Sequence, residues 1–285
     1  CGAEISIAST RVNREKAGSL GLICPDENYR IRDFIEKPGP VADLSDFHCP
    51  QALLPNTSRE RKENPFLASM GMYIFNADVL KEILRGSRAD FAKDIIPQAI
   101  SEYLVHTYVH EGYWEDIGTI KAFYNCNINL TGPTPEFNFY DEDRPIYTHR
   151  KDLPATKMIN CTLHNVIAAE GSILHNASLV NSVAGIRTII EEGALLDRVI
   201  CMGADFYETP EQKKTNERMH RPSIGIGKDT VIKRAIIDMN VRIGSNCRIG
   251  LRSTAPPDGD YGEYFIKDGI IIIPKGSTIQ PGTEI

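Results

Sequence analysis

The sequence has no CxxC pair, and its seven cysteines make an odd number. Neither a disulfide framework nor a zinc site built on paired cysteines is therefore indicated. Several cysteines lie in apolar runs, as in Val199-Ile200-Cys201-Met202, where a free thiol behaves as a small hydrophobe, so we expect a reducing compartment. The sequence also lacks any run of about 18 apolar residues, and no membrane span is expected.

Basic residues are also fewer than acidic residues. Lys and Arg number 32 against 38 Asp and Glu, which gives a net charge of -6. This balance offers no general attraction to nucleic acid or to an anionic membrane. A strongly anionic ligand would therefore need a local cluster of Lys, Arg or backbone N–H groups.

The length of 285 residues and a hydrophobic share of 41% allow two domains with sizeable cores. The first residue is Cys rather than Met, and a strand-like stretch begins almost at once, at Glu4. No charged leader followed by an apolar segment precedes this stretch, so a signal peptide is not indicated. We interpret the chain as a piece of a longer protein.

Residues 1–131 alternate between strand-like and helix-like patterns, which favours an α/β layer architecture. Residues 38–65 and 132–157 are irregular and rich in proline, and we interpret them as a long surface excursion and an interdomain linker. The expected strands are Glu4–Ser9, Ile31–Ile35, a buried Ala68–Phe75 and Leu104–His110, and the expected helices are Asp78–Leu84, Ile95–Tyr103 and Ile120–Leu130.

From residue 158 to residue 285 apolar residues recur every six positions. A period of six fits neither an amphipathic helix nor an alternating strand, but it fits a parallel β-helix of hexapeptide repeats. The repeated apolar position is expected to point inward, and nearby Gly residues suit the turns. The four runs are Ile167, Ile173 and Leu179; Ile189, Leu195 and Cys201; Val231, Ile237, Ile243 and Ile249; and Ile273, Ile279 and Ile285.

The alternative to a β-helix is a β-sandwich whose spacing is accidental, and four runs that share one period disfavour it. Two polar stretches interrupt the repeat, residues 204–222 and 254–265. We expect both to be loops that leave the coil.

Four motifs could carry chemistry. At the end of a strand, Glu36-Lys37-Pro38 offers a compact cation for a phosphate monoester and a carboxylate for sugar hydroxyls. Taken alone, this pair is better explained as a surface ion pair before a turn. The small residues at the start of Ala68–Phe75 would let a ligand approach the backbone closely, although much of this stretch is core.

The carboxylates of Asp90–Asp94 could cap a helix or contact a ligand. Asp116, in Gly112–Thr119, precedes Gly and Thr at an apparent strand-to-helix junction. Such a carboxylate could bind Mg²⁺, which prefers oxygen ligands and bridges to substrate phosphates, or it could cap the following helix. The residues themselves leave these two interpretations equal.

In this order, the motifs resemble those of the ADP-glucose pyrophosphorylases (glucose-1-phosphate adenylyltransferases). The resemblance covers nearly the whole chain. Each motif is short and weak by itself, but their order in front of a hexapeptide domain is specific. The motifs are Phe34–Pro38, Leu67–Tyr73, the Asp90 segment, Gly112–Thr119, Pro145–Thr148, Leu153–Met158 and Met202–Tyr207.

This resemblance implies part of a Rossmann-like nucleotidyltransferase domain followed by a left-handed parallel β-helix that serves oligomer contacts and regulation. It also implies a reaction in which ATP and glucose 1-phosphate give ADP-glucose and pyrophosphate with Mg²⁺, for glycogen or starch synthesis. By similarity, Glu36 and Lys37 hold glucose 1-phosphate, and Asp116 binds the metal. Gly21, Ser69, Tyr73 and Trp114 match further contacts of the sugar site.

Two departures from the family pattern bear on activity. The Gly-rich nucleotide loop and the catalytic aspartate that usually precede this region are absent, so we assign no catalytic residue here and expect the fragment alone to be inactive. Ala92 also stands where the family usually has Gly.

The resemblance further implies small anionic allosteric effectors. Lys275 resembles an activator-binding Lys, and Arg187 resembles an Arg tied to inhibition. Met239 stands where a second activator Lys is found, so regulation should be weak or different. The alternative for each cation is a solvated side chain on a coil edge.

Several functions remain open on sequence alone. The chain could belong to a regulatory, non-catalytic subunit of the same enzyme, or to a sugar nucleotidyltransferase with a different base. Hexapeptide acyltransferases are a further class, and His164 and His175 lie in the coil region, but nothing else suggests a coenzyme A site. By resemblance we expect a homo- or hetero-tetramer in a bacterial cytoplasm or a plastid stroma.

Overall fold

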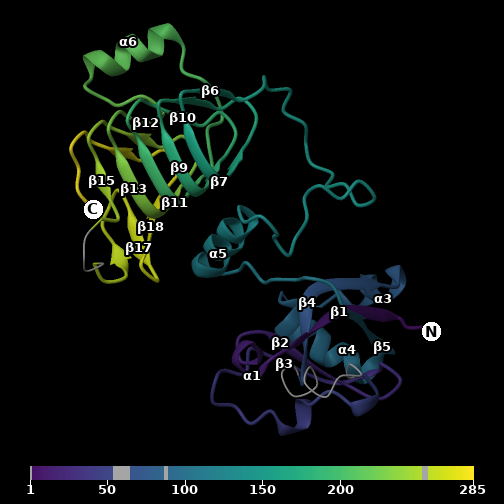
Figure 1. Cartoon of the computed structure of the whole chain (residues 1–285). Coiled ribbons are helices and arrows are strands. Elements are labelled where there is room, and N and C mark those ends of the chain that lie inside the picture. Colours follow the sequence, from purple (N-terminus) through teal and green to yellow (C-terminus); the bar gives the residue numbers. More distant parts are fainter. Residues whose placement is uncertain (1, 54–64, 87–88, 252–255) are drawn as a thin grey trace. The chain divides into compact units, whose positions relative to one another are not determined.

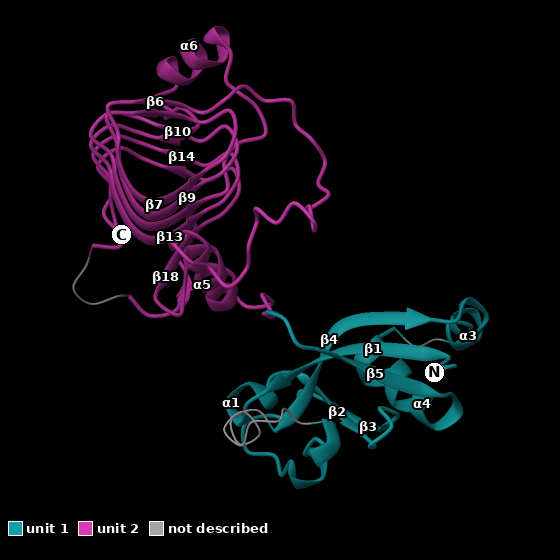
Figure 2. Cartoon of the chain, turned by 45° about the vertical axis from the view of Figure 1, so that its right-hand side comes forward, with its two compact units in different colours: residues 1–114 teal, residues 115–285 magenta. Residues whose placement is uncertain are grey.

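The computed structural model describes residues 2–53, 65–86, 89–251 and 256–285. The chain forms two compact units, residues 1–114 and residues 115–285 (Figure 2). The sequence-based boundary at residue 131 divides the chain by its motifs, whereas this division follows its packing. The difference comes from helix α5 (Ile120–Leu130), whose buried Tyr124 packs with Ile200, Ile236 and Ile270 of the β-helix. The helix therefore lies with the second unit.

Unit 1 is built on a five-stranded sheet in the order β3-β2-β4-β1-β5. Strands β1 and β5 are parallel, and the other neighbours are antiparallel. The strands are β1 (Ile5–Val12), β2 (Gly21–Pro25), β3 (Ile31–Glu36), β4 (Phe66–Phe75) and β5 (Val105–His110). The helices are α1 (Arg14–Ala17), η1 (Ser45–Phe47), η2 (Gln51–Leu53), α3 (Ala77–Ile83), η3 (Phe91–Ile95) and α4 (Ile96–Glu102).

Both faces of this sheet are covered by apolar residues. Ile5 and Ile7 of β1 pack with Ile95 and Ile96 at the start of α4. In a second cluster, Leu22 and Ala68 pack with Leu44 and Phe47, which follow β3. The proline-rich segment predicted to be a surface excursion thus contributes to the core. The rest of that prediction, residues 54–64, lies outside the described residues.

Strand β4 differs from the buried strand expected at Ala68–Phe75. Its first residues, Phe66 to Ala68, are buried, but Met72 is 51% exposed and Ile74 is 76% exposed. The pairing with β2 ends at Ala68, whereas the pairing with β1 continues to Phe75. Beyond Ala68, therefore, only one edge of β4 is paired among the described residues.

Unit 2 is a parallel β-helix, as the six-residue period predicted (Figure 1). Its strands stack in two long sheets, and α5 is its first helix. Between α5 and β6, residues 131–156, all of which are described, form no helix or strand, as expected of a linker. The elements are β6 (Lys157–Ile159), β7 (Thr162–Ala168), β8 (Ile173–His175), β9 (Ser178–Ala184), β10 (Ile189–Ile190), β11 (Leu195–Cys201), α6 (Pro210–Arg218), β12 (Gly225–Ile226), β13 (Val231–Ile237), β14 (Arg242–Ile243), β15 (Arg248–Ile249), β16 (Gly259–Asp260), β17 (Phe265–Lys267), β18 (Ile270–Ile273) and β19 (Thr278–Ile279).

The inward-pointing positions of the coils differ in part from those expected. Ile173 is 38% exposed, whereas its neighbour Leu174 is fully buried, and Leu195 and Leu196 show the same contrast. Adjacent apolar residues share the same period, so the period alone does not fix which of them faces inward. The buried column that results joins successive coils through Leu174, Ile190, Ile226, Ile243 and Ile279.

The coils turn at residues in the left-handed backbone region, such as Asn165 and Asn181, whose side chains are joined by a hydrogen bond of 3.0 Å between Nδ2 of the first and Oδ1 of the second. The two stretches expected to be loops hold regular structure. Residues 204–222 contain α6, which Thr209 and Gln212 cap reciprocally. Residues 254–265 contain β16 and the start of β17, which form an antiparallel pair, while residues 254 and 255 lie outside the described ranges. Within those ranges no helix has the length and apolar character needed to cross a membrane.

Candidate functional site

The strand pair β2–β3 places Gly21 directly beside Glu36. A Cβ added at Gly21 would lie 2.6 Å from Oε2 of Glu36 and 2.7 Å from Cζ of Phe34. Only a residue without a side chain leaves the Glu36 carboxylate and the buried Phe34 ring in these positions. Gly21 therefore shapes the site by leaving space for its neighbours.

Lys37 follows Glu36 at the end of β3 and has a positive φ of 47°. Its backbone N–H donates to the carbonyl oxygen of Leu20 at 3.2 Å, which fixes this backbone turn. The Lys37 ammonium lies 3.7 Å from Oε1 of Glu36, and the Lys37 side chain is 65% exposed while that of Glu36 is 16% exposed. The pair thus presents a solvent-accessible cation held beside a mostly buried carboxylate.

A β-bulge brings Ser69 and Tyr73 to the same region. Ile7 of β1 pairs with Tyr73 and Ser9 pairs with Ser69, so one residue of β1 lies opposite three of β4. Gly71, at the centre of the bulge, has a φ of 70°, and its N–H donates to Oγ of Ser69 at 3.2 Å. Bulges of this kind re-aim side chains beside functional sites. The sequence suggested close backbone approach here, but it did not reveal the bulge.

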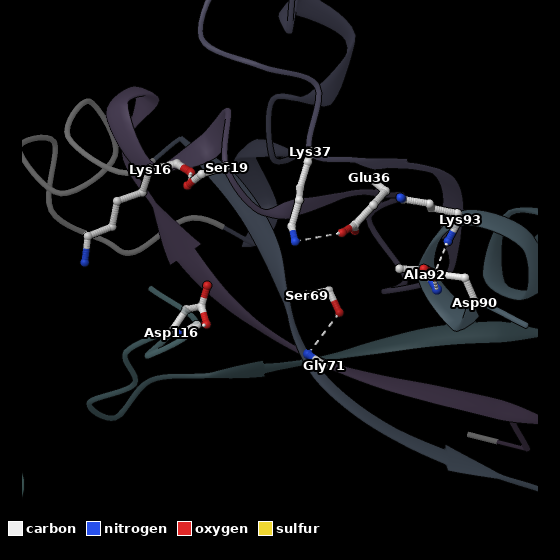
Figure 3. Close-up of polar contacts among 11 residues, drawn as sticks. Lys16, Ser19, Glu36, Lys37, Ser69, Gly71, Asp90, Ala92, Lys93 and Asp116 are labelled. Carbon is white, nitrogen blue, oxygen red and sulfur yellow. Dashed lines mark hydrogen bonds and ion pairs between the residues drawn. The ribbon is translucent and has the colours of Figure 1, made fainter. Parts of the chain in front are cut away.

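The charge of the Glu36 carboxylate acts on the Tyr73 hydroxyl. Burial raises the pKa of the Tyr73 hydroxyl, a hydrogen bond with Ser69 opposes the rise, and the charges of Glu36 and Asp90 add to it. The Tyr73 ring also stacks on Phe91, with ring centroids 5.9 Å apart. In Figure 3 the side chains of Lys37 and Glu36 point toward one another, and the Ser69 hydroxyl points to the backbone N–H of Gly71.

Asp90 caps η3, as one of its two interpretations predicted. Its Oδ1 accepts the N–H groups of Ala92 at 2.8 Å and Lys93 at 2.9 Å. The N–H group of Lys93 lowers the pKa of Asp90 most, and the positive charge of Lys37 contributes to the same direction. Ala92 donates this bond through its backbone, so the absence of Gly at this position leaves the cap intact.

Trp114 is half-buried and packs on the cluster that contains Leu22 and Ala68. These two residues adjoin Gly21 in β2 and Ser69 in β4. Unit 1 therefore brings Trp114 to the strands that carry the other predicted sugar-site residues. All six of these residues, Gly21, Glu36, Lys37, Ser69, Tyr73 and Trp114, belong to unit 1.

Asp116 is the second residue of unit 2, so the packing inside either unit does not fix its distance from Lys37. Its Oδ1 accepts the N–H of Gly118 at 2.9 Å, while the cap of α5 is Thr119, whose hydroxyl accepts the N–H of Ala122 at 3.2 Å. Asp116 is therefore an exposed turn residue and not the helix cap. Its role in metal binding stays a prediction.

Magnesium is the metal that the resemblance implies, and it needs few ligands from the protein. Among the residues described, no three His, Cys, Asp or Glu side chains gather into a metal-binding group. Mg²⁺ keeps several waters and is usually held by one or two carboxylates together with substrate phosphates. A single exposed carboxylate such as Asp116 is compatible with that mode of binding.

The two cations predicted to bind effectors, Lys275 and Arg187, contact the same short segment of unit 2. The Lys275 ammonium lies 2.9 Å from Oδ2 of Asp205. Nη1 of Arg187 donates to the carbonyl oxygen of Ala204 at 3.3 Å, and its guanidinium carbon lies 5.7 Å from the centroid of the Tyr207 ring. Neither is an isolated, solvated cation. The sequence did not indicate Asp205 as a partner, because it lies 70 residues from Lys275.

Comparisons with known proteins match both units. Residues 2–132 match the family model described as nucleotidyl transferase, and residues 151–284 match that described as the GLGC left-handed parallel β-helix domain. A similar protein is the chloroplastic/amyloplastic small subunit of glucose-1-phosphate adenylyltransferase from Triticum aestivum, with 39% identity over 289 residues. That match covers 99% of this chain and 61% of the relative, so the chain spans about three-fifths of the relative's length.

Proposed function

Because the chain belongs to the family of glucose-1-phosphate adenylyltransferases, we propose that the protein it comes from makes ADP-glucose and pyrophosphate from ATP and glucose 1-phosphate. In this reaction a phosphate oxygen of glucose 1-phosphate forms a bond to the α-phosphorus of ATP. The bond from that phosphorus to the β-phosphate oxygen breaks, and pyrophosphate leaves. Positioning and charge neutralisation carry most of the catalysis in such transfers.

The observation that carries this proposal is the Glu36–Lys37 pair at the end of β3, with the bulge of β4 beside it. The exposed Lys37 ammonium would bind the phosphate of glucose 1-phosphate. The Glu36 carboxylate would accept hydrogen bonds from sugar hydroxyls. Ser69 and Tyr73 supply further hydroxyl groups to the same region, and the half-buried Trp114 supplies an apolar wall.

Mg²⁺ would supply charge neutralisation at the reacting phosphates. We propose that Asp116 holds it as a single carboxylate ligand. Within unit 2 the turn formed with Gly118 engages Oδ1 of Asp116, and the carboxylate as a whole is exposed at the surface.

ATP binding would require groups that this chain does not supply, because the Gly-rich loop and the catalytic aspartate of the family are not among its motifs. On the side where β2 pairs, the edge of β4 from Ser69 onward has no partner strand among the described residues, and an added strand there would extend the sheet at the sugar site. We propose that further polypeptide of the same protein takes this place and brings the nucleotide site with it.

The same relative supports proposals for the oligomeric state of the protein and for its cellular compartment. We propose a tetramer in which this chain pairs with identical or related subunits, since the wheat relative is named a small subunit. That relative is named chloroplastic/amyloplastic, and we propose a plastid stroma, with a bacterial cytoplasm as the alternative. A regulatory subunit with the same fold would share the Glu36–Lys37 pair and fail the assay below.

The test is an assay of pyrophosphate release by the full-length protein, with ATP and other nucleotides, at varied glucose 1-phosphate. Lys37→Ala should raise the KM for glucose 1-phosphate roughly 10- to 100-fold, since one charge-assisted contact is lost. The KM for ATP should stay within about twofold, because the proposal assigns Lys37 to the sugar phosphate and not to the nucleotide. The matched control is Lys81→Ala, which also removes an exposed, ion-paired lysine of unit 1. An unchanged KM for glucose 1-phosphate in Lys37→Ala would exclude the role of Lys37.

A further inference from the structure

The turn that presents Lys37 has an unfavourable backbone conformation. Lys37 has a φ of 47°, in the left-handed region that residues with a Cβ rarely adopt. Pro38 follows it, and a residue before proline normally takes an extended conformation with a negative φ. Conformations of this kind persist only where the surrounding structure holds them. Contacts from outside the turn must therefore set the direction in which the Lys37 side chain leaves the end of β3.

The first of these contacts come from the chain that follows α1. The Lys37 N–H donates to the carbonyl oxygen of Leu20 at 3.2 Å, and the Gly39 N–H donates to that of Gly18 at 2.9 Å. Both bonds join backbone to backbone, so they fix the path of the chain through the turn and not only one side chain. The turn is therefore held against the segment between β1 and β2.

Gly18 allows this close approach. A Cβ at Gly18 would lie 2.6 Å from the carbonyl oxygen of Gly39 and 2.8 Å from its carbonyl carbon. Gly18 itself has a φ of -65° and a ψ of -19°, which alanine adopts without strain. The need for glycine at this position thus arises from the contact with the turn and not from the local backbone.

Arg14 holds the far end of the same turn. Its Nη2 donates to the carbonyl oxygen of Pro40 at 3.2 Å and to that of Ala42 at 2.6 Å. Arg14 is the first residue of α1, and Asn13 caps this helix by accepting the N–H of Lys16. The guanidinium therefore reaches from a capped helical turn to two carbonyl groups of the segment that follows Lys37.

We propose that Arg14 is a positioning residue for sugar-phosphate binding, because by holding residues 37–42 against α1 it sets the conformation in which Lys37 presents its ammonium group. Gly18 serves the same purpose by leaving room for the turn. Arg14 acts through Lys37 and not on the substrate itself. The inference deepens the proposed function, from which it takes the role of Lys37 in binding glucose 1-phosphate.

The first consequence is local and independent of catalysis. Pro38 and Pro40 have no N–H group, so Lys37 and Gly39 carry the only backbone amides of the turn. Loss of one net hydrogen bond shifts an equilibrium by roughly two- to tenfold. In the 285-residue chain, Arg14→Ala should therefore speed hydrogen exchange of these two amides by about three- to tenfold.

The second consequence is kinetic. In the full-length protein, Arg14→Ala should raise the KM for glucose 1-phosphate roughly three- to tenfold and leave kcat and the KM for ATP within about twofold. In a Lys37→Ala background, Arg14→Ala should have no further effect on the KM for glucose 1-phosphate, because the ammonium group through which it acts is gone. A general loss of stability would instead add to the effect of Lys37→Ala.

Two further variants complete the experiment. Gly18→Ala should displace the turn without altering Arg14, and it should change the exchange rates and the KM in the same direction. The matched control is Arg32→Ala, which removes an exposed arginine near the other end of β3 that donates to Asp26 at 2.6 Å. This control should change neither quantity. Circular dichroism checks the folding of each variant, and the exposed position of Arg14 makes unfolding by Arg14→Ala unexpected.

Faster exchange in Arg14→Ala and Gly18→Ala, together with a KM effect that vanishes in the Lys37→Ala background, supports the proposal. Unchanged exchange or an unchanged KM in Arg14→Ala overturns it, and so does a KM effect of the same size with and without Lys37. If Lys37→Ala itself leaves the KM for glucose 1-phosphate unchanged, the proposed role of Lys37 fails, and the exchange rates alone decide whether Arg14 holds the turn. The two failures are therefore distinguishable.

Discussion

Gly21→Ala tests whether the Glu36 carboxylate sits where the site requires it. The added methyl group would lie 2.6 Å from Oε2 of Glu36 and 2.7 Å from Cζ of Phe34. Phe34 is only 6% exposed and cannot move outward, so the clash must be relieved by a shift of the strand pair or of Glu36. Overpacking of this kind costs about 1–3 kcal/mol of unfolding free energy.

Two assays report on this substitution. Urea unfolding of the 285-residue chain should show unit 1 destabilised by about 1–3 kcal/mol, and the full-length protein should show a raised KM for glucose 1-phosphate. The control is Gly86→Ala, because a Cβ at Gly86 meets nothing within 4 Å. That substitution should change neither quantity.

A double-mutant cycle identifies the clash itself. Phe34→Leu removes the far edge of the ring, so Gly21→Ala should cost less in that background, with a coupling of about 0.5 kcal/mol or more. Gly21→Ala that behaves like Gly86→Ala would refute the reasoning. Additive effects of Gly21→Ala and Phe34→Leu would refute the assignment of the clash to the ring.

Two further predictions concern the β-helix. Glu208→Gln should destabilise unit 2 by about 3–5 kcal/mol in urea unfolding, since it leaves the buried Arg242 guanidinium, which lies 2.6 Å from Glu208, without an opposite charge, and a loss below about 1 kcal/mol would contradict this. Burial alone would raise the pKa of Glu208, but the N–H of Ile224 and the guanidinium of Arg242 hold it below its ordinary value of 4.5. The stabilisation is therefore present above pH 4.5 and lost as the pH falls through the lower folded pKa, so wild type should lose stability more steeply there than Glu208→Gln. Burial raises the pKa of the Cys201 thiol to about 12, so Cys201 should resist iodoacetamide at pH 8 in the folded chain and react once unfolded, and fast reaction in the folded chain would exclude this burial.

The sequence predicted the elements of both units well where periodicity alone decides them. Helix α5 has the bounds that its pattern indicated, and the period of six identified the β-helix. The same pattern could not decide between Ile173 and Leu174 as the inward residue, because both belong to apolar pairs with the same period. That choice depends on packing between coils.

Some local features were present in the sequence and could have been found. Thr209-Pro210-Glu211-Gln212 is a capping box with proline at the first helical position, and it starts α6 inside a stretch expected to be a loop. The bulge at Gly71 left a weaker signal, a glycine within an otherwise strand-like run.

Other features depend on contacts that are distant in sequence. Packing of Tyr124 on the β-helix moves α5 out of the first unit, although a helix pattern does not say which unit it joins. The pairing of Asp205 with Lys275 likewise depends on the stacking of coils. For the proposed sugar site, the residues come from the resemblance and stay a prediction, and the structure adds the reason for Gly21 and the bulge at Ser69.

The central claim is that Lys37 binds the phosphate of glucose 1-phosphate. The most direct measurement is a crystal structure of the full-length protein with glucose 1-phosphate and a non-hydrolysable ATP analogue. The account predicts a sugar phosphate oxygen about 3 Å from the Lys37 ammonium and a sugar hydroxyl bonded to Glu36. A sugar phosphate bound away from both side chains would contradict the account.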